Sequence, residues 1–86
     1  MKLVVRYGNQ PLTFFKKQDR LISERIMDKI NELVDNPIPH DAKRVEGKRE
    51  LVFRIRVGKN RVLYEVDYDN NIIGIIKIGN REEVYN

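Results

Sequence analysis

The stretch Leu51–Val66, LVFRIRVGKNRVLYEV, decides the fold, because it alternates apolar and polar residues on both sides of the pair Gly58-Lys59. Such alternation is typical of half-buried strands, and a two-residue connection with glycine first predicts a type II′ hairpin. The resulting register pairs Arg56 with Arg61 and puts Arg54 on the same face. Like charges directly across a ladder are destabilising, so we interpret this cluster as a site for an anion.

The other face of the same hairpin carries apolar side chains, which we expect to pack in the core. They are Leu51, Phe53, Ile55 and Val57 on the first strand, and Val62, Tyr64 and Val66 on the second. The register places Phe53 opposite Tyr64 and Ile55 opposite Val62. Tyr64 is therefore predicted to be a core residue, and the hairpin separates a core face from a basic face.

Two helices are predicted before the hairpin. A proline suits the first turn of a short helix over Pro11–Lys17, with Leu12 and Phe15 facing inward. Asp19 can cap a second helix over Arg20–Val34. The apolar residues of the second helix recur at spacings of three and four, which predicts a core-facing stripe of Ile22, Ile26, Met27, Ile30, Leu33 and Val34.

Strands are predicted near both ends of the chain. Residues 1–7 read as a short strand, and residues 71–78 (NIIGIIKI) are so apolar that we expect a central strand covered on both faces. Gly74 in that strand would permit the close approach of a packed group. The pair Asp69-Asn70 is predicted to close the hairpin into it, and residues 43–50 to form a basic turn or a short strand.

These elements follow in the order β-α-α-β-β-β. Hairpin connections force antiparallel pairing of the last three strands, and the helices must cover one face of the sheet. We therefore predict a single α+β domain over residues 1–86. It has a mainly antiparallel four-stranded sheet with two helices packed on one face and the arginines on the other.

Composition narrows the functional classes. The chain has no cysteine and one histidine, His40, in a predicted loop, which excludes disulfides, a thiolate or multi-histidine metal site and a histidine-based triad within one chain. No targeting or membrane-spanning segment is evident, so we expect a soluble cytoplasmic protein without a membrane partner. The net charge of +4 is uneven, since residues 43–61 hold eight basic and two acidic residues. A basic middle of this kind is typical of a polyanion site.

The order of motifs resembles the RelE/ParE superfamily of toxin components over nearly the whole chain. The segments that carry the resemblance are Glu46-Gly47, Phe53-Arg54-Ile55-Arg56-Val57-Gly58, Arg61-Val62-Leu63-Tyr64, Gly79-Asn80-Arg81 and Val84-Tyr85. Within the superfamily, the chain is similar to RelE more than to ParE. The resemblance implies a ribosome-dependent endoribonuclease that cuts messenger RNA in the ribosomal A site, needs neither metal nor cofactor, and is held inactive by a RelB-type antitoxin.

The resemblance also implies the residues of the site. Carried over by position, the catalytic residues are Arg54, Arg56, Arg61, Arg81 and Tyr85. Arginine forks match phosphate oxygens two at a time and can stabilise charge that grows on phosphorus. No arginine is a plausible base, because its guanidinium stays protonated. Tyr85 is thus the nearest group to an acid or base, or else it stacks on a nucleobase.

Further basic residues are expected to contact the RNA backbone, namely Lys43, Arg44, Lys48, Arg49 and Lys59. Two other functions stay open at this stage. A ParE-like toxin would inhibit a protein target such as DNA gyrase without nuclease activity. A nucleic-acid-binding module would bind strongly at low salt and leave its substrate intact.

Overall fold

The computed structural model describes residues 3–45, 47, 51–80 and 84 of the chain. Within these residues the elements follow in the order β1 (Val4–Tyr7), α1 (Asn9–Lys17), α2 (Arg20–Asp35), β2 (Lys43–Arg44), β3 (Leu51–Val57), β4 (Asn60–Asp67) and β5 (Ile72–Gly79). The predicted α+β class and the predicted order of helices and main strands are confirmed.

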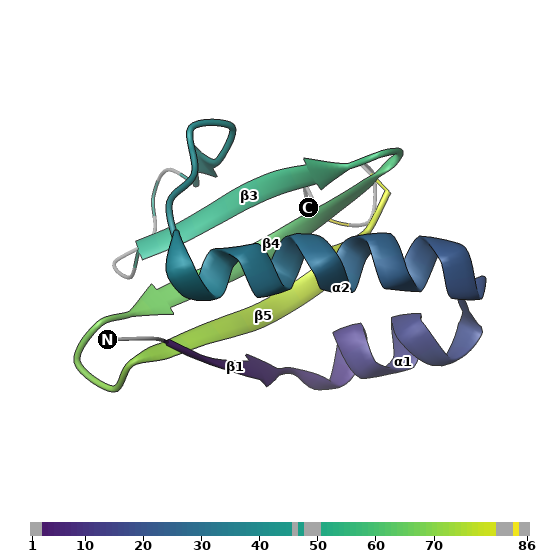
Figure 1. The fold of residues 1–86 in the computed structure, drawn as a ribbon, viewed down its shortest axis with the longest axis horizontal. Helices are drawn as coiled ribbons and strands as arrows, with labels where there is room; N and C mark the ends of the chain where they lie inside the picture. Colours follow the sequence, from purple (N-terminus) through teal and green to yellow (C-terminus); the bar gives the residue numbers. More distant parts are fainter. Residues whose placement is uncertain (1–2, 46, 48–50, 81–83, 85–86) are drawn as a thin grey trace.

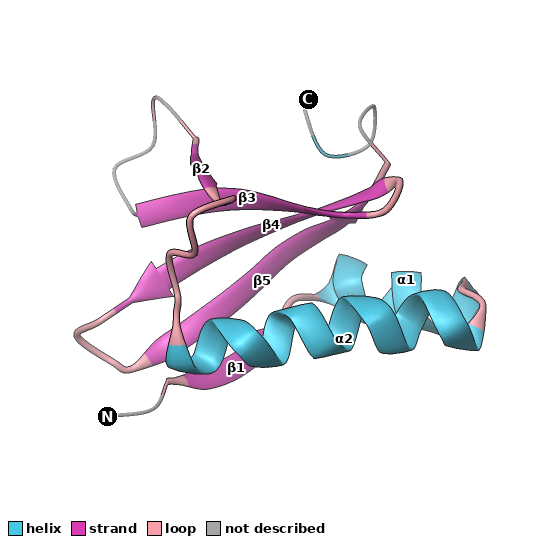
Figure 2. Ribbon diagram, turned by 45° about the horizontal axis from the view of Figure 1, so that its top comes forward, coloured by secondary structure: helices cyan, strands magenta, loops and turns pink. Residues whose placement is uncertain are grey.

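The strands form one sheet in the order β1-β5-β4-β3-β2 (Figures 1 and 2). β1 is parallel to β5, and the other neighbours are antiparallel. Figure 2 shows both helices on the same face of this sheet, as predicted. The sheet has one strand more than the four expected, because the two-residue β2 pairs with β3. β2 lies in residues 43–50, which the sequence predicts to form either a turn or a short strand.

The β3–β4 hairpin has the predicted register. Arg56 pairs with Arg61, and Phe53 with Tyr64. Gly58 has a φ of +61°, whereas Asn71 is the one non-glycine residue of the described chain with positive φ. Positive φ at the first turn position alone is the requirement of a type II′ turn, so the glycine and its place in the turn are both explained.

The β4–β5 connection is longer than a two-residue turn. Asp67 pairs with Ile72, and the four residues between them include Asn71 with a φ of +57°. The Asp67 carboxylate accepts hydrogen bonds from the Asn70 backbone N–H at 3.1 Å and from Asn70 Nδ2 at 2.9 Å. Closer to the other end of β5, a bulge beside Leu63 shifts the pairing by one residue.

Asp19 caps α2 as predicted, with its Oδ1 accepting a hydrogen bond of 3.0 Å from the Leu21 N–H.

The core lies between the helices and the sheet. The buried cluster contains Leu3, Ile26, Ile30, Leu33, Phe53, Ile55, Val62, Tyr64, Val66, Ile73, Ile75 and Ile78. Two inward predictions are wrong, since Leu12 is 48% exposed and Met27 is 43% exposed. Phe15 packs against the core as expected.

Among the described residues, helices α1 and α2 cover the central strand β5 on one face only, which corrects the prediction for residues 71–78. Ile73, Ile75 and Ile78 are buried, but Ile76 is 42% exposed. A Cβ added at Gly74 would meet the side chain of Glu65 at an ordinary 3.9 Å, so no close approach requires glycine there. The apolar sequence reflects one helix-covered face together with a second face on which Ile76 is exposed and Ile72 is half-buried.

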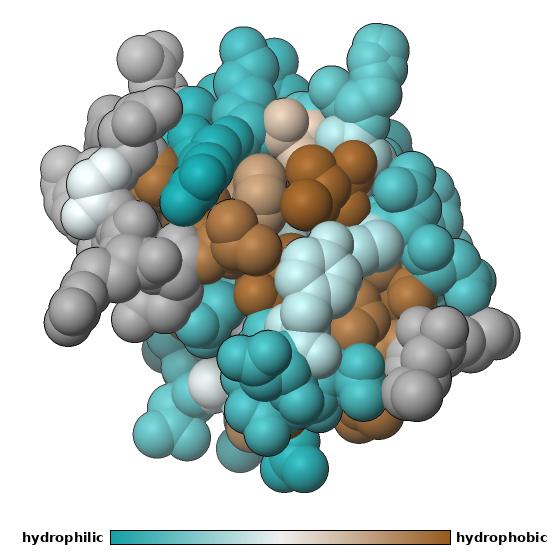
Figure 3. Space-filling model, turned by 90° about the vertical axis from the view of Figure 1, so that its left-hand side faces the viewer, coloured by the Kyte–Doolittle hydropathy of each residue, from teal (hydrophilic) through white to brown (hydrophobic). Residues whose placement is uncertain are grey.

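Apolar side chains are also exposed at one end of the molecule. Figure 3 shows them, in brown, among hydrophilic side chains at the end where α2 stops and β4 turns into β5. Ile38, which follows α2, is 43% exposed, and Tyr68, in the β4–β5 turn, is 52% exposed. Among the residues that the structure describes, no helix is long and apolar enough to cross a membrane.

Candidate functional site

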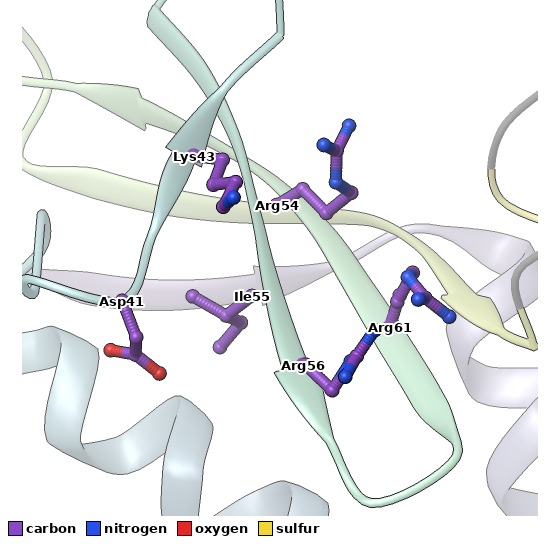
Figure 4. Close-up of a pocket in the computed structure, with 6 residues that line it drawn as sticks. All are labelled: Asp41, Lys43, Arg54, Ile55, Arg56 and Arg61. Carbon is purple, nitrogen blue, oxygen red and sulfur yellow. The ribbon is translucent and has the colours of Figure 1, made fainter.

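A hollow of about 320 Å³ lies against the edge of the sheet at β3 (Figure 4). The described residues that line it are Asp41, Lys43, Arg54, Ile55, Arg56 and Arg61. Four of these six side chains are basic, so the hollow is a concentrated positive site that a small anion or a phosphate group can enter.

Strand geometry brings the arginines together. Side chains of a strand alternate between faces, so Arg54 and Arg56 share a face and Ile55 points to the other. Figure 4 shows this arrangement, with Ile55 and Asp41 on one side of β3 and the arginines on the other. The register places Arg61 of β4 directly opposite Arg56, and Lys43 of β2 opposite Arg54. Three adjacent strands therefore supply the positive charge.

The hollow exists because β2 is so short. It pairs with β3 at Lys43 and Arg44 only, whereas an antiparallel continuation would have placed Asp41 and Ala42 beside Arg56 and Ile55. The chain diverges from β3 instead, and this divergence opens the space beside the last residues of that strand. Backbone N–H and C=O groups at such an uncovered edge are available to a ligand.

Two contacts fix the loop that leads into β2. The Tyr64 hydroxyl donates a hydrogen bond of 2.7 Å to the Pro37 carbonyl oxygen. Lys29 Nζ lies 3.2 Å from Asp41 Oδ2. The hydrogen bond from Lys29 is the main reason why the pKa of Asp41 is lowered, so this carboxylate is ionised at neutral pH. These contacts hold Asp41 and Lys43 at the rim of the hollow.

The arginine face is not purely polar. Val52 lies on the same side of β3 as Arg54 and is only 4% exposed. Leu63 of β4, opposite Arg54, is half-buried. Apolar surface beside an arginine can support its methylene stem while the guanidinium stays available to polar groups. Such supported forks suit two-point recognition of phosphate oxygens.

The structure brings together some of the residues predicted to act, and separates others. Arg54, Arg56, Arg61 and Lys43 line one hollow. Arg44 is exposed, but it pairs with Phe53 and so belongs to the opposite side of the sheet. Lys59 lines a different hollow, between the hairpin tip and α2. The remaining predicted residues, Lys48, Arg49, Arg81 and Tyr85, lie outside the described residues.

Sequence reasoning missed Asp41 as a residue of the hollow. The sequence predicts only a loop over Pro37–Asp41, and no spacing rule connects Asp41 to arginines more than ten positions away. The signal that could have found it is its position in the chain, since Asp41 lies only two residues before Lys43 at the start of the basic segment. In the described part of the chain, no group of three or more acidic, histidine or cysteine side chains could hold a metal ion.

A mainly antiparallel sheet with two helices behind it and a basic face in front has close structural counterparts among toxins. The RelE chain in the archaeal RelE–RelB complex of Pyrococcus horikoshii OT3 superposes with a TM-score of 0.82 and 25% identity, over 94% of this chain and 97% of that one. The isolated Escherichia coli RelE toxin gives a TM-score of 0.79 over 96% of this chain and 90% of its own, at 20% identity, and so shares the fold.

Sequence comparisons agree with the fold. The family model for the ParE toxin of the type II toxin-antitoxin system parDE matches residues 5–85. A Methanocaldococcus jannaschii protein named "Putative toxin RelE1" is 45% identical over 65 residues, which cover 72% of this chain and 71% of that protein. The chain belongs to the RelE/ParE superfamily of type II toxin-antitoxin toxins. Within this superfamily it lies close to RelE.

Proposed function

We propose that this chain is a ribosome-dependent, metal-independent endoribonuclease that cleaves messenger RNA in the ribosomal A site. The observation that carries the proposal is the set of cations around one hollow, Lys43, Arg54, Arg56 and Arg61, contributed by three strands of a rigid sheet. A nuclease of this kind needs positive charge fixed at the scissile phosphate before the reaction begins.

The reaction is an internal transfer of phosphorus. The ribose 2′-oxygen attacks the adjacent phosphorus, the bond from phosphorus to the 5′-oxygen breaks, and the products are a cyclic phosphate and a free 5′-hydroxyl. The proton of the 2′-hydroxyl leaves to a base, and the departing oxygen gains a proton. Arg54, Arg56 and Arg61 would stabilise the charge on the phosphorane, with Arg81 as a fourth donor and Tyr85 as the acid–base or stacking residue.

The ribosome would supply what the chain lacks. No arginine can act as a base at neutral pH, so the reaction depends on precise placement of the substrate. Further basic residues are proposed to contact RNA backbone and hold the protein in the A site: Lys43 at the hollow, Arg44 and Lys59 away from it, and also Lys48 and Arg49. A substrate found on translating ribosomes implies action in the cytoplasm, by one domain comprising residues 1–86.

A RelB-type antitoxin is the proposed partner. Related RelE chains were solved in complex with RelB from P. horikoshii and from Mycobacterium tuberculosis, where the second pair is named RelBE2. The basic face of this chain suits an acidic partner by charge complementarity. We expect the antitoxin to cover or displace the segment 81–86, and so to block the proposed Arg81 and Tyr85.

The test is primer extension on a defined messenger RNA in a translating extract. The wild type should produce breaks that need the ribosome. Arg61→Ala should reduce the breaks by about 100-fold or more, as loss of one transition-state donor does in other enzymes. Arg20→Ala is the matched control, because Arg20 is an exposed α2 residue whose side chain is 91% exposed, and it should cleave as the wild type does. Undiminished cleavage by Arg61→Ala would refute the role assigned to the site.

An inhibitor of ParE type is the second candidate, favoured by the family model that matches residues 5–85. In that case the chain would arrest growth through a protein target such as DNA gyrase, and no new RNA ends would form. Growth arrest that survives Arg61→Ala without RNA breaks would support this function. Salt-dependent RNA binding without any breaks would instead indicate a binding module.

A further inference from the structure

The sheet edge formed by β1 stops before β5 does. The last pair joins Tyr7 to Ile75, and the Gly8 N–H then donates a hydrogen bond of 2.9 Å to the Ile75 carbonyl oxygen. β5 continues to Gly79, and no strand of the described residues pairs with it on this side beyond Ile75. Backbone groups on such a half-buried edge need other partners, because an unpaired group loses its hydrogen bond to water on folding.

The side chain of Gln10 supplies them. Its Nε2 donates to the Ile78 carbonyl oxygen at 2.8 Å, and the Ile78 N–H donates to Gln10 Oε1 at 2.8 Å. One amide thereby replaces a single residue of a neighbouring strand. α1 starts close enough to allow this, since a Cβ at Gly8 would lie only 3.3 Å from the Ile75 oxygen.

This pair of hydrogen bonds between the Gln10 amide and the Ile78 backbone, here called the Gln10–Ile78 clasp, lies beside the candidate site. Ile78 pairs with Val62 on β4, and the next residue, Gly79, pairs with Arg61. From Gly79 the chain enters Asn80 and then the proposed Arg81. The end of β5 thus determines which residues lie next to Arg61 and where the following segment begins.

The register at this end needs an additional restraint. A bulge beside Leu63 places one extra β5 residue between the pair Leu63–Lys77 and the pair Tyr64–Ile75. A bulge interrupts the ladder, and a slip by one residue turns side chains to the opposite face. Gln10 forms its two hydrogen bonds to β5 beyond the bulge, at Ile78, so it can stabilise the shifted pairing of β5 with β4 there.

We propose that Gln10 is a positioning residue, which fixes the end of β5 and with it the pairing of Gly79 with Arg61, a residue of the candidate site. The proposal deepens the endoribonuclease function and rests on it for one of its two tests. Gln10 itself need not touch RNA. Its effect passes through two backbone hydrogen bonds to Ile78 and from there to Gly79.

Gln10→Glu is the most informative variant. An ionised carboxylate has no proton to donate to the Ile78 carbonyl oxygen, and the repulsion between the two oxygens should displace the side chain from both backbone groups of Ile78. A protonated carboxyl group has one donor and one acceptor, and so restores both hydrogen bonds. Gln18→Glu is the matched control with the same charge change, since Gln18 Oε1 accepts a hydrogen bond from the Asp19 N–H, which a carboxylate can also accept.

The first test measures backbone amide chemical shifts and hydrogen exchange in the full chain between pH 4 and pH 8. At pH 8, Gln10→Glu should exchange the Ile78 amide about tenfold faster or more than the wild type and shift the Gly79 and Arg61 signals; at pH 4, where a glutamate is largely protonated, these should return towards the wild type. Gln18→Glu should leave them unchanged. Gln10→Met, which removes both bonds, should resemble Gln10→Glu at pH 8. Unshifted Gly79 and Arg61 signals in both Gln10 variants would overturn the proposal.

The second test uses single-turnover cleavage on programmed ribosomes at neutral pH. Gln10→Met should lower the maximal cleavage rate by about tenfold and leave the half-saturating concentration unchanged, because alignment and not ribosome binding is affected. An equal loss in Gln18→Glu, or a change in half-saturation alone, would overturn the role in alignment. If the wild type does not cleave, the endoribonuclease function fails, and the spectroscopic test by itself decides the role of Gln10.

Discussion

Replacing Tyr64 with phenylalanine should destabilise the fold and change how stability depends on pH. Tyr64 is fully buried, stacks on Phe53 with ring centroids 5.8 Å apart, and donates its hydroxyl to the Pro37 carbonyl oxygen at 2.7 Å. Phenylalanine keeps the stacking and removes the hydrogen bond. The free energy of unfolding at pH 7 should fall by about 1–2 kcal/mol, the usual effect of removing a buried hydrogen bond. For a domain of this size, the melting temperature should drop by roughly 5–15 °C.

The pH dependence follows from the raised pKa of Tyr64. Burial is the main cause, with smaller contributions from Asp41 and Tyr68. The folded state keeps the phenolic proton above pH 10, where the unfolded state releases it. The stability that Tyr64 contributes is therefore fully present below pH 10 and is lost as the pH rises above that value, by up to about 1.4 kcal/mol per pH unit. Phenylalanine cannot ionise, so the two proteins should become more similar in stability between pH 9.5 and pH 11.

Urea unfolding followed by far-ultraviolet circular dichroism measures both effects. Wild type and Tyr64→Phe are compared at pH 7, 9.5, 10.5 and 11. Tyr68→Phe serves as the control, because Tyr68 is 52% exposed and its loss should change stability by less than about 0.5 kcal/mol. Equal stability at pH 7 would show that the hydroxyl contributes nothing. A constant difference from pH 9.5 to pH 11 would contradict the retained proton.

Three further changes test the local physics. Asp19→Ala should lower the free energy of unfolding by about 1 kcal/mol in urea melts, because the α2 N-terminus loses the cap on Leu21; an unchanged midpoint would argue against the cap. Gly58→Ala should cost roughly 1–2 kcal/mol by the same assay, since alanine resists a φ of +61°, and a neutral result would place the strain elsewhere. Asp41→Asn should cost less than about 1 kcal/mol at pH 7, because its ion pair with Lys29 is exposed. Because the pKa of Asp41 is lowered in the folded state, the stability that the ion pair contributes is present above the unfolded pKa near 4 and is lost as the pH falls through the folded pKa. A stability difference between wild type and Asp41→Asn that grew towards pH 3 would contradict this reasoning.

The β3–β4 hairpin shows which features of the fold can be predicted from residue patterns within a short stretch of sequence. Alternation over 16 residues and a glycine at the turn fixed the face of every side chain, so the pairing of Arg56 with Arg61 was predictable. The cap at Asp19 and the core residues of α2 were predictable for the same reason, since a helix repeats every 3.6 residues regardless of its neighbours.

The wrong predictions concern residues whose exposure depends on whether another element packs against them. Leu12 and Met27 are apolar residues at the margin of a helical stripe, and both are exposed in the structure. The all-apolar sequence of β5 suggested cover on two faces, yet α1 and α2 both lie on the same face of the sheet. Periodicity gives the direction of a side chain, but the number of packed layers depends on the whole chain.

The sequence by itself determined the order of elements, the hairpin register and the clustering of Arg54, Arg56 and Arg61 on one face, because each follows from repeats of a few residues. Tertiary structure alone decided that β1 joins β5 in parallel, that Asp41 and Lys43 border the arginine hollow, and that Lys59 does not. It also decided the clasp between Gln10 and Ile78, residues 68 positions apart. Contacts of such sequence separation leave no periodic trace, since they form only when separate elements pack together.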